Sequence, residues 1–63
     1  MTYNKDQWIE SFEGQLFFLR PHLTQRVLSS LGLTEWHQVG RGGADPIMAA
    51  KELSKLFDKG KTQ

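Results

Sequence analysis

The sequence contains no cysteine, only two prolines and no long apolar run. Without cysteine the chain can form neither a disulfide framework nor a thiolate zinc site, which argues against the class of small secreted disulfide proteins. Apolar runs such as Leu16–Leu19 are far shorter than the roughly 20 residues that span a bilayer. Residues 1–6 also lack the apolar stretch of a secretory signal. We therefore expect a cytoplasmic protein that does not cross a membrane.

The composition that remains is that of a small folded domain. Apolar residues make up 38% of the 63 residues, and eight Lys and Arg nearly balance seven Asp and Glu. This is neither a disordered nor a strongly charged composition. The length predicts one domain over residues 1–63, with a frayed tail at 60–63. A domain of this size buries only about 60% of its unfolded surface, so helix packing or self-association has to stabilise it.

The first segment has the signals of an amphipathic helix over residues 5–19. Asn4 is a preferred N-cap, and Tyr3 and Trp8 occupy the positions of a hydrophobic staple. Pro21 disfavours helical geometry in the residue before it and predicts the end of the helix. At about 100° per residue, one stripe of the segment collects Trp8, Ile9, Phe12, Leu16 and Leu19.

A second helix is predicted over residues 24–32. Thr24 can cap it, and Gly32 can end it as a left-handed residue. Its apolar face comprises Val27, Leu28 and Leu31. One further helical turn could form near residues 35–39, before the glycine-rich stretch 40–44, which has the composition of a flexible loop.

The pair Asp45–Pro46 combines a preferred N-cap with a preferred first helical residue and predicts a third helix over residues 46–59, closed by Gly60. Its apolar stripe comprises Ala49, Ala50, Leu53, Leu56 and Phe57. No segment alternates apolar and polar residues as a strand does. The sequence thus predicts an all-α fold: a small compact bundle of three helices, with a short extra helical turn near 35–39.

Three aromatic residues exceed what one small core needs. Phe17 and Phe18 project about 130° to either side of the main stripe of the first helix, so one helix face cannot bury both. A bundle could enclose one ring, or a ring could belong to a surface that binds another protein. Trp36 likewise could cap the core or serve as an aromatic anchor. We take Phe17, Phe18 and Trp36 as the candidate protein-binding residues.

The segment 23–41 offers an alternative, a helix-turn-helix motif that reads DNA. The match is partial, because Leu28 stands where the motif favours a small residue and Gly40 shortens the second helix. The candidate nucleic-acid contacts are Arg26, His37, Gln38 and Arg41. The near balance of charge argues against this alternative, since phosphate binding needs a basic face.

Catalysis finds little support in the sequence. His22 and His37 are the only histidines and have no third ligand at helical spacing, so no metal site is expected. Glu10 and Glu13 lie on the polar face of the first helix, where solubility accounts for them. A chain this short has too little mass to enclose a substrate pocket. We therefore expect no enzyme activity, no cofactor and no small-molecule substrate.

Together these observations favour a non-catalytic cytoplasmic protein that acts by protein–protein interaction. Adaptors, regulators and inhibitors of larger proteins belong to this class. The partner is expected to be another protein or a second copy of the chain, which would make a homodimer. Because the total stability of such a small domain is only about 3 to 9 kcal/mol, pairing would stabilise it appreciably. A small DNA-binding transcriptional regulator is the alternative.

Overall fold

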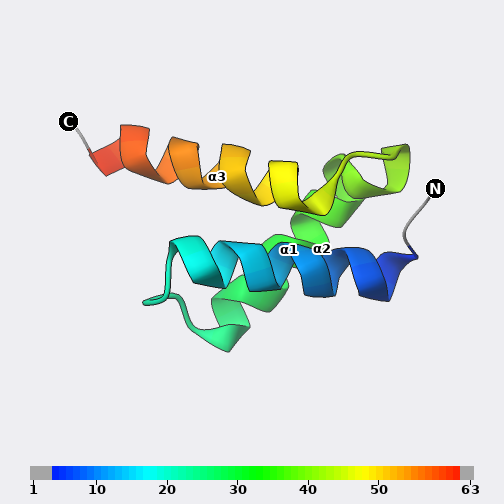
Figure 1. The fold of residues 1–63 in the computed structure, drawn as a ribbon, viewed down its shortest axis with the longest axis horizontal. Coiled ribbons are helices and arrows are strands. Elements are labelled where there is room, and N and C mark those ends of the chain that lie inside the picture. Colours follow the sequence, from blue (N-terminus) through cyan, green and yellow to red (C-terminus); the bar gives the residue numbers. More distant parts are fainter. Residues whose placement is uncertain (1–3, 62–63) are drawn as a thin grey trace.

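A computed structural model describes residues 4–61 and shows three helices arranged around the first (Figure 1). The elements are α1 (Lys5–Leu19), α2 (Gln25–Gln38), the 3₁₀ turn η1 (Gly40–Gly42) and α3 (Pro46–Lys61). α1 and α3 lie side by side and run in the same direction, while α2 returns behind them. No strand occurs within these residues. The predicted all-α bundle of three helices is therefore confirmed.

The residues predicted to begin the helices do cap them. A side-chain oxygen of each cap accepts the backbone N–H three residues ahead, which satisfies one of the donors that a helix start leaves unpaired. The pairs are Asn4 with Gln7 (2.8 Å), Thr24 with Val27 (3.3 Å) and Asp45 with Met48 (3.0 Å). The predicted staple residue Tyr3 lies outside the described residues.

The core is built on α1, because α2 and α3 both pack against α1 and hardly touch each other. The buried apolar residues are Trp8, Phe12, Leu16, Leu28, Ala49 and Ala50. The predicted stripe of α3 is wrong at one position, Leu56, which is 61% exposed. Leu56 lies about 120° around the helix from Ala50 but only about 20° from Ala49, so it stands at the edge of the buried face rather than at its centre.

The predicted end of the second helix at Gly32 is wrong. α2 continues through Gly32 to Gln38 and takes in the extra turn expected near 35–39. Gly32 is buried against α1, where a Cβ atom would lie 2.9 Å from Cγ2 of Ile9. Gly32 therefore serves close packing of two helices, and tertiary contact overrides the stop signal.

The glycine-rich stretch forms an ordered end of the bundle. Within it, η1 packs on two indole rings, since a Cβ at Gly40 would lie 2.6 Å from Cε3 of Trp36 and 2.8 Å from Cε2 of Trp8. Trp8 donates from Nε1 to the carbonyl oxygen of Ala44 at 2.7 Å. The expectation of a flexible loop over residues 40–44 misses these contacts, which depend on residues far away in the sequence.

At the opposite end of α1, Arg20 ties the helix to α3. Its Nε donates to Oγ of Ser54 at 3.0 Å, and its Nη2 donates to the Ser54 carbonyl oxygen at 2.8 Å. The guanidinium carbon lies 5.9 Å from the centroid of the Phe57 ring. α3 extends beyond the predicted end at residue 59 and includes Gly60. Of the predicted frayed tail, residues 62 and 63 lie outside the described residues.

Candidate functional site

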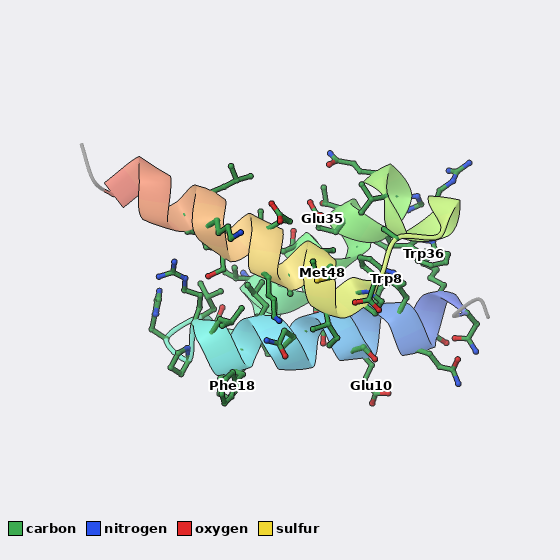
Figure 2. The ribbon with its side chains drawn as sticks, turned by 45° about the horizontal axis from the view of Figure 1, so that its top comes forward. Trp8, Glu10, Phe18, Glu35, Trp36 and Met48 are labelled. Atoms are coloured by element: carbon green, nitrogen blue, oxygen red, sulfur yellow. The ribbon has the colours of Figure 1, made fainter. Side chains whose placement is uncertain are left out.

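Two adjacent aromatic residues lie outside the core on the outer side of α1. Phe17 is 51% exposed and Phe18 is 78% exposed. Figure 2 shows Phe18 and Glu10 projecting from the side of α1 that faces away from α3. The expectation that one helix face cannot bury both rings agrees with this arrangement, since neither ring is buried.

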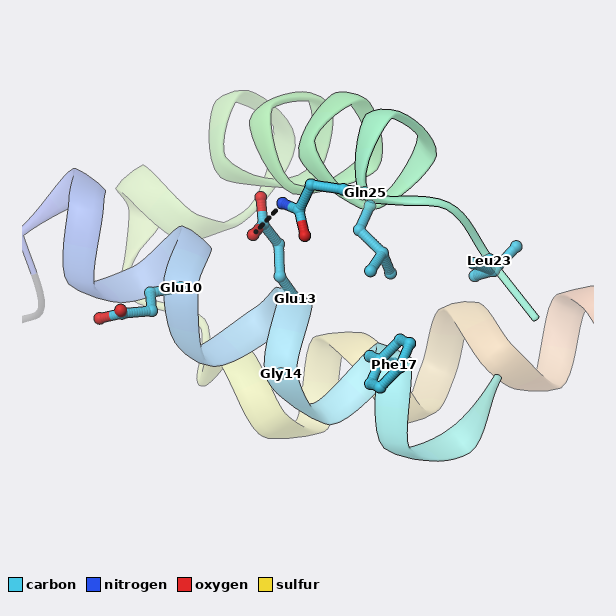
Figure 3. A pocket seen from close by; sticks show the side chains of 7 residues that line it. Glu10, Glu13, Gly14, Phe17, Leu23 and Gln25 are labelled. Atoms are coloured by element: carbon cyan, nitrogen blue, oxygen red, sulfur yellow. Dashed lines mark hydrogen bonds between the residues drawn. The ribbon is translucent and has the colours of Figure 1, made fainter. Parts of the chain in front are cut away.

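A groove of about 410 Å³ lies between α1 and the first half of α2 (Figure 3). Its lining residues are Glu10, Glu13, Gly14, Phe17, Leu23, Gln25 and Leu28. Phe17 projects from α1 toward the start of α2, while Glu10 lies at the rim and points outward. The groove thus has an apolar end and an acidic end.

The break between the two helices positions the apolar end. After Arg20 the chain turns, and the backbone N–H of Leu23 donates to the Arg20 carbonyl oxygen at 3.1 Å. This turn brings Leu23 back beside Phe17. At the acidic end, Gln25 donates from Nε2 to Oε1 of Glu13 at 3.2 Å and spans the two helices. The groove is therefore set by the junction of α1 and α2.

Gly14 lines the groove in the middle of α1, and no packing contact explains it. A Cβ atom at Gly14 would meet no heavy atom within 4 Å. Glycine in a helix interior costs roughly 0.5–1 kcal/mol relative to alanine. The chain therefore carries a destabilising residue at an open surface position, where the backbone of α1 is left uncovered.

Acidic residues follow one line along α1 toward Phe17. Asp6, Glu10 and Glu13 precede it with spacings of four and three residues, which places them on neighbouring positions of one helix face. Such like charges repel each other by about 0.2–0.5 kcal/mol per pair. No Lys, Arg or His is among the described residues that line the groove. The carboxylates of Glu10 and Glu13 therefore have no cationic neighbour among the residues that line the groove.

One carboxyl group on α2 has a perturbed pKa. Partial burial raises the pKa of Glu35, because desolvation disfavours the charged form. Glu35 is not among the groove residues, and Figure 2 shows it on the part of the molecule near Trp36. Its pKa therefore bears on stability rather than on the groove.

Trp36 is separate from the exposed phenylalanines. It is half-buried, packs against the core and meets Trp8 edge-on with ring centroids 5.9 Å apart. Trp8 precedes Phe17 by nine residues, or about 13 Å along α1. The structure thus brings Phe17 and Phe18 to one region and leaves Trp36 at the other end of the bundle.

The four predicted nucleic-acid contacts are exposed but do not form a helix-turn-helix. Arg26, His37 and Gln38 lie on α2, and Arg41 lies in η1. Because α2 is continuous through Gly32, the turn and the recognition helix of the motif are absent. Eleven residues separate Arg26 from His37, about 16 Å along one helix. The helix-turn-helix expected over residues 23–41 is therefore wrong, whereas DNA binding by these four residues stays a prediction.

The described part of the chain holds no candidate metal-binding cluster, no unpartnered buried polar side-chain atom and no candidate membrane-spanning helix. Among those residues, no group of three or more His, Cys, Asp or Glu side chains could hold a metal ion. No buried side-chain nitrogen or oxygen there is without a hydrogen-bond partner. None of the helices over residues 4–61 is both long enough and apolar enough to span a membrane.

Comparisons with protein-family models, with curated proteins and with solved structures found no match to this chain.

Proposed function

We propose that this chain is a non-catalytic protein that binds another protein through the outer side of α1. The observation that carries the proposal is the pair Phe17 and Phe18, both exposed on a domain whose core is complete without them. Adaptors, regulators and inhibitors of larger proteins act in this way. The absence of cysteine suits a reducing compartment such as the cytoplasm.

The adjacent positions of Phe17 and Phe18 support the proposal more than the mere presence of two exposed apolar residues does. Exposed apolar residues also occur singly elsewhere, as at Leu33 and Leu56, and single ones are normal on protein surfaces. Phe17 and Phe18 are consecutive residues of α1, and Phe17 lines a groove with an open backbone position at Gly14. Aromatic residues are enriched in protein–protein interfaces, where clustered anchors contribute most of the binding energy.

Photo-cross-linking in cells that naturally contain this sequence tests the proposal. A photoreactive phenylalanine analogue replaces Phe18 in one variant and Leu56 in a matched control, since Leu56 is also exposed but lies on α3. We expect a discrete adduct from position 18 and none from position 56. Adding Phe17→Ser to the first variant should weaken the adduct, because a partner that reaches Phe18 is expected to contact the adjacent exposed ring of Phe17 as well.

The mass of the adduct distinguishes the kinds of partner. An adduct near twice 7.2 kDa identifies a second copy of the chain, and a larger discrete mass identifies another protein. The same set of adducts from positions 18 and 56, or none from either, contradicts the proposal. Light scattering over a concentration series provides an independent measure of self-association.

A further inference from the structure

We propose that the groove between α1 and α2 binds a basic amphipathic helix of another protein. This inference rests on the proposed function and specifies which element of the partner docks. The groove joins an apolar end, at Phe17, Leu23 and Leu28, to an acidic end, at Glu10 and Glu13. A helix with apolar and cationic residues on one face matches both ends, as in other helix-in-groove complexes.

The dimensions of the groove suit a helix of a few turns. Glu10 and Phe17 are seven residues apart, or about 10 Å along α1, which is two helical turns. An apolar side chain of the partner would enter beside Phe17 and Leu23. A Lys or Arg three, four or seven positions away on the same helix face would then reach the acidic end.

At Gly14 the groove is lined by the backbone of α1, because glycine has no side chain to cover it. Because a Cβ there would touch nothing within 4 Å of this chain, the glycine leaves space that only an incoming molecule can use. Two helices approach most closely where one of them lacks a side chain. The docking of a partner helix across Gly14 thus explains a residue that otherwise only destabilises α1.

The negative charge beside the groove favours a basic partner helix over an acidic one. Glu10, Glu13 and the preceding Asp6 place up to three negative charges along one side of the docking site, and no cationic residue lines the groove in the described part of the chain. An acidic partner helix would meet like charge, which disfavours it. The chain as a whole carries a net charge of +1, so this negative region is local.

A second copy fits the groove less well than another protein does. On α3, Met48, Lys51 and Lys55 form a basic and apolar face of the required kind. However, Lys55 lies 3.8 Å from a carboxylate oxygen of Glu52, which offsets its charge. To close as a dimer, docking of α3 into the groove of another copy would also have to be reciprocal about a two-fold axis. We therefore assign the groove to a different protein.

Titration with a designed peptide, followed by amide chemical shifts of the full chain, tests the inference. The probe has about 14 residues, with Leu every three or four positions and Lys elsewhere, and the control peptide has Glu in place of Lys. We expect the Lys peptide to shift the amides of the groove residues and the Glu peptide to leave them unchanged. Raising the salt concentration should weaken binding, since exposed charges are screened.

Gly14→Leu is the decisive variant. The leucine should occupy the groove and weaken peptide binding by at least about tenfold, while thermal stability stays equal or rises, because leucine is a better helix former than glycine. Gly42→Ala is the matched control, since a Cβ at Gly42 also meets nothing within 4 Å but lies in η1. Loss of binding together with retained stability cannot result from unfolding.

Charge reversal tests the acidic end separately. Glu10→Lys should weaken binding of the Lys peptide several-fold, because it replaces an attraction between exposed charges by a repulsion. Glu52→Lys on α3 makes the same change away from the groove and should leave binding unchanged.

The inference is overturned if the Lys peptide does not bind, if the Glu peptide binds equally well, or if Gly14→Leu leaves the affinity unchanged. It is also overturned if light scattering shows oligomers that Gly14→Leu dissociates, since a second copy then occupies the groove. These outcomes leave the proposed function standing as long as position 18 still cross-links to a partner. Loss of that cross-link with peptide binding intact would instead remove the proposed function.

Discussion

The two sides of α1 both carry aromatic residues, which are buried on the inner side and exposed on the outer side. On the inner side, Trp8, Phe12 and Leu16 are fully buried, and the rings of Trp8 and Phe12 stack 5.4 Å apart. On the outer side, Phe17 and Phe18 are exposed and have no such packing partners in the core. The difference teaches that aromatic content alone does not locate a core, because the same residue type is buried on one side of α1 and exposed on the other, where we propose that it binds a partner.

The two glycines inside helices repeat this contrast. Gly32 on α2 faces α1, where a Cβ would press on Ile9 at 2.9 Å. Gly14 on α1 faces open space. Gly32 is therefore explained by packing within the chain, whereas no contact within the chain explains Gly14, and the proposed docking of a partner helix accounts for it.

The largest expected effect separates the two sides of α1 directly. Phe12→Ala should lower the free energy of unfolding by about 3–5 kcal/mol, because it leaves a cavity in the core. Phe18→Ala should change it by less than about 0.5 kcal/mol, since the ring is largely exposed. Chemical denaturation of both variants, followed by circular dichroism, measures the difference. Equal destabilisation would show that Phe18 belongs to the core.

A smaller effect is expected at the buried glycine. Gly32→Leu should destabilise the protein by about 1–3 kcal/mol, because the side chain has to separate α1 from α2. The same substitution at Gly14 should not destabilise it, so the pair of melting temperatures is the measurement. If Gly32→Leu melts at the wild-type temperature, α2 does not pack on α1 as closely as described.

The smallest effect concerns Glu35, whose pKa burial raises in the folded state. The unfolded chain loses this proton at a lower pH than the folded chain does. The protonated carboxyl group therefore makes its whole contribution to the free energy of unfolding at pH values below the ordinary glutamate pKa. This contribution is lost as the pH rises through the raised pKa of the folded state. Glu35→Gln should remove this part of the pH dependence and leave the variant more stable than the wild type at neutral pH.

Denaturation of the wild type and Glu35→Gln across the acidic range measures this difference. If the two curves of stability against pH run parallel, Glu35 is as well solvated in the folded state as in the unfolded chain.

Local signals predicted those parts of the fold that local interactions decide. The caps at Asn4, Thr24 and Asp45 act within three residues, and the sequence shows them directly. The break at Pro21 is likewise a local steric effect. Gly32 misled the prediction because its role depends on Ile9, which is distant in the sequence, so no local pattern can distinguish close packing from a helix end.

The candidate site was predictable in part. The angular positions of Phe17 and Phe18 indicate from the sequence alone that one face cannot bury both. The groove was not predictable, because it requires the turn after Arg20 to place Leu23 and Gln25 beside α1. A signal was nevertheless present: a glycine in the middle of a helix, on the face opposite the apolar stripe, beside acidic residues at helical spacing.

Both tryptophans of the chain, Trp8 and Trp36, lie in one cluster at the end of the bundle near η1. Intrinsic fluorescence excited at the indole band therefore reports on that end, where unfolding exposes both rings to water. Trp8 is buried and lies about 160° around α1 from Glu10, the groove residue nearest to it along the helix, and phenylalanine contributes little to that signal. The emission spectrum can thus follow unfolding of every variant described above, while a bound helix in the groove leaves it nearly unchanged.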